Sequence, residues 1–232
     1  MMKRILFSLI LVLPLSLYGQ KNPVYEYGDN AYMRGLQLYE KEKYSAARQV
    51  FDQLIASSHP DSRSEVLSEA YFYRAMSAVE LRNGDSEHLV HTFVSTYPES
   101  PHVNEATFRL ADYFYDRNSW PRCITWYNRV DRHKLKGNEI SEYHFKKGYA
   151  HYMRKDYEGA RVAFYEILDV DSPYNAPATY YYSHIHYTDG NYETALMGFR
   201  KIDSDPLFSG IAPYYISQIL YMQKKYDEVI VY

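Results

Sequence analysis

The histidines are the side chains of this chain best suited to bind a metal ion, and two pairs are close in sequence. His184 and His186 lie two residues apart, which on a helix directs them to different faces. His144 and His151 are seven residues apart and can share a face, but no second pair has a matching spacing. Because structural metal sites usually have four ligands, the sequence predicts no metal site.

The other side chains of catalytic type are arranged like ordinary structural residues. Glu105, Asp112 and Asp116 follow helical spacing along one segment, which is typical of a solvated helix face rather than of two acids across a cleft. No nucleophile elbow, zinc-protease, dinucleotide-binding or phosphate-loop motif occurs. The single cysteine, Cys123, excludes an internal disulfide and is interpreted as a small buried residue. We therefore expect no catalytic residue and no cofactor.

Aromatic residues form a more regular pattern, and tyrosine is in excess, with 28 in 232 residues. Small residues recur about every 35 positions. An aromatic stands three residues before each, and a tyrosine four residues after five of the six, so both lie on one helix face. The tyrosines at these two sites are Tyr32, Tyr39, Tyr115, Tyr152, Tyr180, Tyr187, Tyr214 and Tyr221. Tyrosine combines a large contact area with a hydroxyl, so one interpretation is a groove for an extended peptide or a helix. The other is that the rings pack one helix against the next.

These side chains must be positioned by a repeated pair of helices, which we call leading and trailing. Each small residue is followed nine positions later by an aromatic, then after three by another small residue, then after four by a second aromatic. The residues that follow this rule are Gly35, Tyr44, Ala47 and Phe51; Ala75; Ala111, Trp120, Cys123 and Tyr127; Gly148, Tyr157, Ala160 and Phe164; Ser183, Tyr192, Ala195 and Phe199; and Ser217 and Tyr226. The small residues allow the two helices to approach closely, and the aromatics fill the seam to the next hairpin. One hairpin cannot bury its apolar face alone, so the hairpins must stack.

The helix boundaries follow from the same pattern. The predicted leading helices are 29–40, 63–82, 102–117, 138–153, 174–188 and 210–223, and the predicted trailing helices are 44–57, 85–97, 120–131, 157–169, 192–202 and a stub from 226. The second copy departs from the rule after Ala75, because its trailing half is shifted by an insertion near Gly84.

The pattern resembles the tetratricopeptide (TPR) repeat, most clearly in Tyr157, Ala160 and Phe164. The resemblance covers 28–232 and implies an all-α, right-handed α-solenoid of about six TPR hairpins. The repeats would span about 28–60, 66–99, 102–134, 140–173, 175–206 and an incomplete 210–232. In this family the leading helices line the concave surface that contacts ligands. The family's usual leading tryptophan is absent from every copy.

The N-terminus predicts a secretory signal peptide over 1–19, followed by a short lead-in over 20–27. Lys3 and Arg4 precede an apolar run over 5–17, which is too short for a comfortable membrane span. Cleavage near Gln20 would leave a periplasmic or secreted protein without a membrane span, and an uncleaved anchor is the alternative. With this segment the chain resembles TPR proteins of bacterial envelopes, BamD-like in repeat type but without their lipid-anchor cysteine.

The function predicted from these features is that of a non-catalytic scaffold or adaptor for protein partners. The net charge of -3 and the absence of a basic cluster argue against a nucleic-acid partner. A glycan-binding protein that uses the same tyrosines is the alternative. The sixth repeat stops early, so Ile216, Leu220, Val229 and Ile230 are expected to form an exposed or half-covered apolar surface that invites association.

Overall fold

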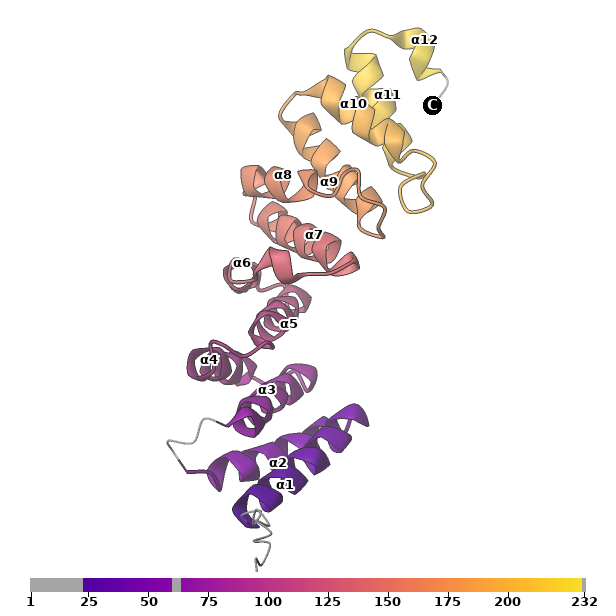
Figure 1. Cartoon of the computed structure of the whole chain (residues 1–232). Helices are drawn as coiled ribbons and strands as arrows, with labels where there is room; N and C mark the ends of the chain where they lie inside the picture. Colours follow the sequence, from indigo (N-terminus) through magenta and orange to yellow (C-terminus); the bar gives the residue numbers. More distant parts are fainter. Residues whose placement is uncertain (1–22, 60–63, 231–232) are drawn as a thin grey trace, which may run out of the picture.

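The computed structural model describes residues 23–59 and 64–230, so the expected signal peptide lies outside the described residues. Within these ranges the chain forms helices and no strands (Figure 1). The α-helices are α1 (Pro23–Glu40), α2 (Tyr44–Ala56), α3 (Glu65–Glu80), α4 (Ser86–Thr96), α5 (Val103–Asp116), α6 (Trp120–Tyr127), α7 (Asn138–Met153), α8 (Tyr157–Tyr165), α9 (Asn175–Thr188), α10 (Tyr192–Lys201), α11 (Ala212–Met222) and α12 (Tyr226–Val229), and a 3₁₀ helix η1 (Arg132–Lys134) follows α6. The predicted all-helical fold is confirmed.

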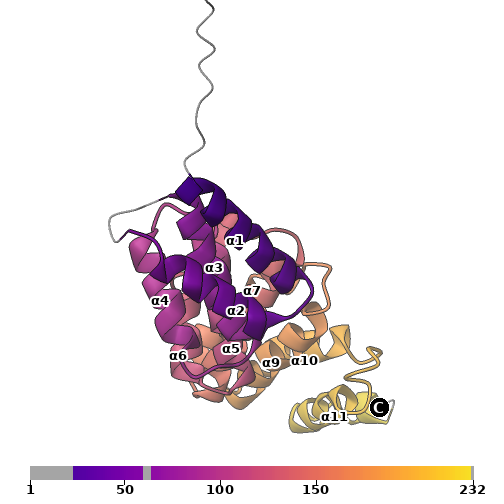
Figure 2. The same cartoon turned by 90° about the horizontal axis from the view of Figure 1, so that it is seen from below.

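The helices stack as successive antiparallel hairpins, with the leading helices odd-numbered and the trailing helices even-numbered (Figure 1). From α1 to α9, each leading helix also contacts the next leading helix. We call this side of the stack the leading-helix face and the opposite side the trailing-helix face. Seen from below, α11 is displaced sideways from α1, so the stack is coiled rather than straight (Figure 2).

A left-handed residue ends the leading helix in every hairpin turn. These turn residues with positive φ are Glu42, Arg82, Asn118, Lys155, Gly190 and Lys224. This conformation terminates a helix and reverses the chain within a few residues. Only the fifth turn supplies glycine, the residue for which the conformation carries no steric cost.

The small residue of the leading helix packs directly on the second aromatic of the trailing helix. A Cβ atom added to Gly148 would lie 2.8 Å from Cε1 of Phe164, and one added to Gly35 would lie 2.6 Å from Cε1 of Phe51. Both phenylalanines are fully buried. Most other small and second-aromatic positions of the rule are also buried, among them Ala47, Ala75, Ala111, Cys123, Ala160, Ala195 and Phe199. Tyr44, Trp120, Tyr157 and Tyr192 are half-buried in the seams, whereas Tyr226 is exposed.

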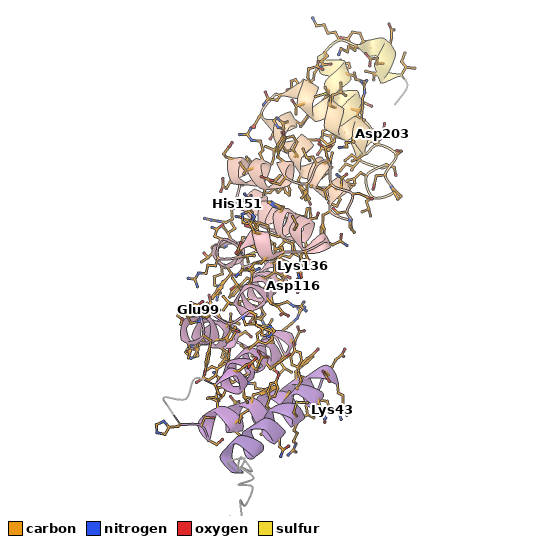
Figure 3. All side chains as sticks on the ribbon, viewed as in Figure 1. Lys43, Glu99, Asp116, Lys136, His151 and Asp203 are labelled. Carbon is orange, nitrogen blue, oxygen red and sulfur yellow. The ribbon has the colours of Figure 1, made fainter. Side chains whose placement is uncertain are left out.

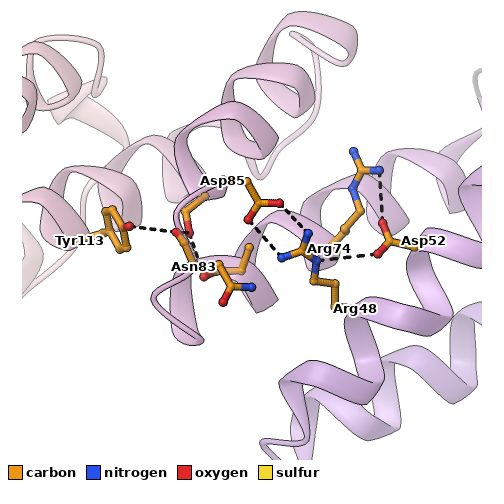
Figure 4. A network of polar contacts seen from close by, with 8 residues as sticks. Arg48, Asp52, Arg74, Asn83, Asp85 and Tyr113 are labelled. Atoms are coloured by element: carbon orange, nitrogen blue, oxygen red, sulfur yellow. Dashed lines mark hydrogen bonds and ion pairs between the residues drawn. The ribbon is translucent and has the colours of Figure 1, made fainter.

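Polar contacts join the first three hairpins where side chains leave the apolar seams (Figure 4). Arg48 of α2 donates two hydrogen bonds to Asp85, at 3.2 and 2.6 Å. Arg74 of α3 forms an ion pair with Asp52 at 3.6 Å. The Tyr113 hydroxyl donates to the backbone oxygen of Asn83 at 2.9 Å, which ties α5 to the preceding turn. These contacts fix the register of one hairpin on the next.

Two trailing helices are shorter than predicted, because asparagine side chains of leading helices bind the backbone that follows them. The Asn104 side chain donates a hydrogen bond to the backbone carbonyl of Asp131 at 3.2 Å and accepts one from the backbone N–H of Asp131 at 2.7 Å. Because Asp131 is held in this way, the chain leaves the α6 axis after Tyr127. Asn175 donates to the carbonyls of Ile167 and Leu168, and α8 ends at Tyr165. At the N-terminus α1 begins at Pro23, inside the expected lead-in, since proline is well tolerated in the first helical turn.

The expected apolar surface at the C-terminal end is found for two of its four residues. Val229 is half-buried and Ile230 is 85% exposed. The expectation is wrong for Ile216 and Leu220, which are fully buried because this face of α11 packs with Leu196 and Phe199 of α10. No helix in the described part of the chain is long and apolar enough to cross a membrane.

Candidate functional site: the leading-helix face

Two cavities open on the leading-helix face, and Arg109 and Asp112 border both. The smaller, about 120 Å³, lies between α3 and α5. The larger, about 480 Å³, lies between α5, η1 and the start of α7. We call the lining of these two cavities the polar groove. It occupies the middle of the stack, and Figure 3 labels Asp116 and Lys136 along it.

The floor of the polar groove is a cluster of paired charges. Lys146 of α7 binds Asp112 of α5 at 2.9 Å and Glu142 at 2.5 Å. The Tyr127 hydroxyl donates to the same Asp112 carboxylate. Burial raises the pKa of Asp112, although the Lys146 ammonium opposes that shift. The cluster is internally satisfied and fixes α5, α6 and α7 relative to one another.

The position of Asp112 contradicts the expectation that Glu105, Asp112 and Asp116 form one solvated helix face. Glu105 and Asp116 are exposed, as a solvated face requires, but the side chain of Asp112 is only 18% exposed. Cys123 is buried beneath the cluster, and burial together with the Asp112 charge raises its pKa to about 12. The thiol is therefore protonated at neutral pH and poorly suited to act as a nucleophile.

Arg109 is the unpaired cation that borders both cavities of the polar groove, whereas Lys134 and Lys136 line the larger cavity alone. Its guanidinium forms no hydrogen bond or ion pair with any residue in 23–59 or 64–230, and the residue is exposed. Burial raises the pKa of the nearby Tyr39, and the Arg109 charge opposes that shift. A guanidinium with all its donors available suits a carboxylate or a row of backbone carbonyls.

The polar groove lies between two stretches of aromatic seam. Two residues before the small residue, α5 and α7 have Arg109 and Lys146, whereas α3, α9 and α11 have Tyr73, Tyr181 and Tyr215. Each of these tyrosines contacts a ring of the preceding leading helix. The ring-centroid distances are 5.0 Å for Tyr39–Tyr73, 4.9 Å for Tyr152–Tyr181 and 5.2 Å for Tyr187–Tyr215. The charges therefore replace aromatic contacts in the centre of the stack.

Most tyrosines predicted to line a groove lie in these seams. Tyr32, Tyr39, Tyr115, Tyr152, Tyr180 and Tyr187 are half-buried, and only Tyr214 and Tyr221 are well exposed, at 58% and 65%. The Tyr152 hydroxyl bonds His184 at 3.1 Å and the Tyr187 hydroxyl donates to Gln218 at 2.7 Å, so both have partners on the next leading helix. Of the phenylalanines three residues before a small residue, Phe108 is buried and Phe145 is half-buried.

Sequence reasoning missed the polar groove. The sequence does contain an indication of it. Two residues before the small residue, three other leading helices have a tyrosine, whereas α5 has Arg109 and α7 has Lys146. Within the described ranges, no group of three or more histidine, cysteine, aspartate or glutamate side chains is placed to bind a metal ion.

Comparison with solved structures identifies the arrangement of hairpins. The sequence matches no family model and no curated protein. MamA (AMB-1) superposes with a TM-score of 0.62 at 14% identity, over 78% of this chain and 92% of that one. A tetratricopeptide repeat protein from Parabacteroides merdae superposes with a TM-score of 0.59 at 13% identity, over 90% and 77%. The chain has the tetratricopeptide repeat fold. PilF of Pseudomonas aeruginosa shares it, with a TM-score of 0.54 at 10% identity over 90% of both chains.

Three partly or fully buried histidines give the TPR stack a pH-dependent stability. Burial lowers the pKa of His144, His184 and His186 below the ordinary histidine value of about 6.5. As the pH falls from about 7 the unfolded chain takes up these protons first, so the free energy of unfolding decreases until the folded pKa values are passed. Denaturant titrations at pH 7.5 and 5.5 measure the loss. Replacing all three histidines with glutamine should flatten the difference, and an unchanged difference would contradict this origin.

Proposed function

We propose that the protein is a non-catalytic scaffold or adaptor of a bacterial envelope, and that it binds a segment of a partner protein along the leading-helix face. The observation that supports this most directly is Arg109, an unpaired guanidinium where two cavities meet. The paired floor of Asp112, Lys146 and Tyr127 holds the neighbouring helices in place around it. A rigid groove with an unpaired guanidinium at its centre is suited to binding, because little side-chain order has to be gained.

The chemistry of the polar groove indicates an extended segment with an acidic side chain near its middle. Arg109 is placed to bind that carboxylate in a bidentate manner. Glu105 and Asp116, which are exposed on either side of Arg109 along α5, suit basic or hydrogen-bond-donating neighbours. The glycan alternative loses support, because most rings on which a sugar would stack are packed between helices.

A photo-crosslinking amino acid in place of Pro101 tests the binding face, because Pro101 is exposed and lines the larger cavity beside Arg109, which is kept. We expect the full-length protein in its native host to form a crosslink to one partner from position 101. The same substitution at Thr125, an exposed residue of the trailing helix α6, is the matched control and should give none. Crosslinks from Thr125 alone, or crosslinked glycan without protein at position 101, would contradict the proposal.

The envelope location depends on the predicted signal peptide. Mass spectrometry of the protein from its native host should find an N-terminus close to Gln20. A soluble protein that retains Met1, or one found in the cytoplasm, would contradict export without affecting the proposed binding face.

A further inference from the structure

A third cavity, of about 310 Å³, lies on the trailing-helix face between α6, α7 and α8. We call it the outer cavity. Its lining includes Tyr143 and His144 of α7 and Gly159 and Ala163 of α8, with Arg132 and Lys147 among the charged residues. Figure 3 labels His151, which also lines the outer cavity, and Lys136, which borders the polar groove. The two sites share no lining residue.

A buried imidazole without a hydrogen-bond partner lines the outer cavity. His144 is only 7% exposed, and its ring nitrogens bond no residue in the described ranges, although the ring packs edge-on against Tyr143. Its nitrogens are not among the fully enclosed polar atoms that lack a partner, so they are accessible from the outer cavity that the residue lines. The fold does not require a histidine here, because the equivalent residues of α5 and α9 are Thr107 and Thr179, and that of α3 is Tyr71, whose ring packs on Tyr97.

One wall of the outer cavity is held in place by a glycine. The Asp156 carboxylate bonds the His151 ring at 2.6 Å and accepts the Gly159 N–H at 3.1 Å. A Cβ atom on Gly159 would lie 2.5 Å from Nδ1 of His151. Any other residue at this position would displace the His151 ring, so the glycine is needed for the wall as it stands.

The charges around His144 indicate what the outer cavity can bind. Arg132 forms no side-chain hydrogen bond or ion pair within the described residues, and Lys147 uses one of its donors on the Tyr143 hydroxyl at 3.0 Å. Glu166 is the one carboxylate of the lining that forms no hydrogen bond or ion pair with the described residues. Free donors therefore exceed free acceptors, which favours a ligand carboxylate. Glu166 can accept from a nearby N–H or ammonium group of the same ligand. The volume is at the small end of ligand sites, which start at about 300 Å³.

We propose that the outer cavity binds an amino-acid-sized ligand through its carboxylate, with Arg132, Lys147 and His144 as hydrogen-bond donors. The same chemistry is offered by a free amino acid and by the C-terminal residue of a peptide. This site does not depend on the proposed function of the leading-helix face.

Titration followed by the NMR signals of the His144 ring tests the proposal. The probes are L-alanine, L-leucine and L-glutamine, each also as its N-acetyl derivative and as its carboxamide, added to the full-length protein. We expect at least one carboxylate compound to shift these signals saturably and its carboxamide not to. If the N-acetyl form binds as well, the ligand is a chain terminus; if only the zwitterion binds, it is a free amino acid. No shift with any carboxylate, or an equal shift with the carboxamide, would overturn the proposal.

Two substitutions in one short helix supply the matched control. Arg132 and Lys134 both belong to η1, but Arg132 lines the outer cavity and Lys134 lines the polar groove. Because a charge-assisted hydrogen bond is lost, Arg132→Gln should weaken binding about tenfold or more, whereas Lys134→Gln should leave it unchanged. His144→Phe, which keeps a ring against Tyr143 but removes the NMR probe, should abolish the heat of binding in a calorimetric titration of a protein with an unchanged circular dichroism spectrum. Equal effects of Arg132→Gln and Lys134→Gln would refute a site in the outer cavity.

Discussion

Replacement of Phe164 by alanine should lower the free energy of unfolding by about 3–5 kcal/mol, because the ring is fully buried between two hairpins. Replacement of Gly148 by leucine should also be costly, by about 1–3 kcal/mol or more, since even a Cβ atom would lie 2.8 Å from the Phe164 ring. Both losses arise at one contact, so they should not add. Denaturant unfolding of each variant measures them.

The double variant Gly148→Leu with Phe164→Ala is the decisive measurement. The leucine side chain should occupy part of the space that the phenylalanine ring leaves, so the double variant should be more stable than the sum of the two losses by about 1 kcal/mol or more. Phe199→Ala combined with Gly148→Leu is the matched control, because Phe199 is buried in the next hairpin. Simple additivity for Gly148 with Phe164 would show that the glycine does not act through this contact.

This contact also explains why the helices could be predicted from the sequence. The small residue and the aromatic sixteen positions later, as in Gly148 and Phe164, fix the length of the leading helix, the turn and the trailing helix together. The boundaries failed where a side chain from elsewhere binds the backbone. The early end of α6 depends on Asn104, which is 27 residues from its partner Asp131. Helical periodicity contains no information about such a contact.

The candidate site could be predicted less well, for a related reason. A tyrosine four residues after the small residue has the same spacing whether it faces solvent or the next leading helix. What decides its environment is the residue opposite, such as Tyr181 against Tyr152. Asp112 was assigned to a solvated face because its spacing is helical, but Lys146 and Tyr127 from two other helices cover it. The two cavities depend on these pairings, and no single segment predicts them.

The seam tyrosines should behave as packing residues when they are truncated. Tyr152→Ala and Tyr187→Ala should each lower the free energy of unfolding by about 2 kcal/mol or more, because each removes ring contacts to the next helix and one hydrogen bond. Tyr221 occupies the same register in α11 but is 65% exposed and contacts the Tyr226 ring. Tyr221→Ala should therefore change stability by no more than about 0.5 kcal/mol. Thermal or denaturant unfolding of the three variants provides the comparison.

Comparison of these tyrosine variants with the single variant Arg109→Ala distinguishes residues that stabilise the fold from residues that bind the partner. Arg109 is exposed and has no partner among the described residues, so its removal should cost no more than about 0.5 kcal/mol of stability. If the polar groove is the binding site, Arg109→Ala should weaken capture of the crosslinked partner in a protein of unchanged stability. Tyr152→Ala should show the reverse, with a lower melting temperature and capture that is intact below it. If Tyr152→Ala lost capture of the partner but kept its full stability, the tyrosines rather than the polar groove would be the binding site. The hydrogen bonds of these tyrosines in the seams would then be unnecessary for the fold.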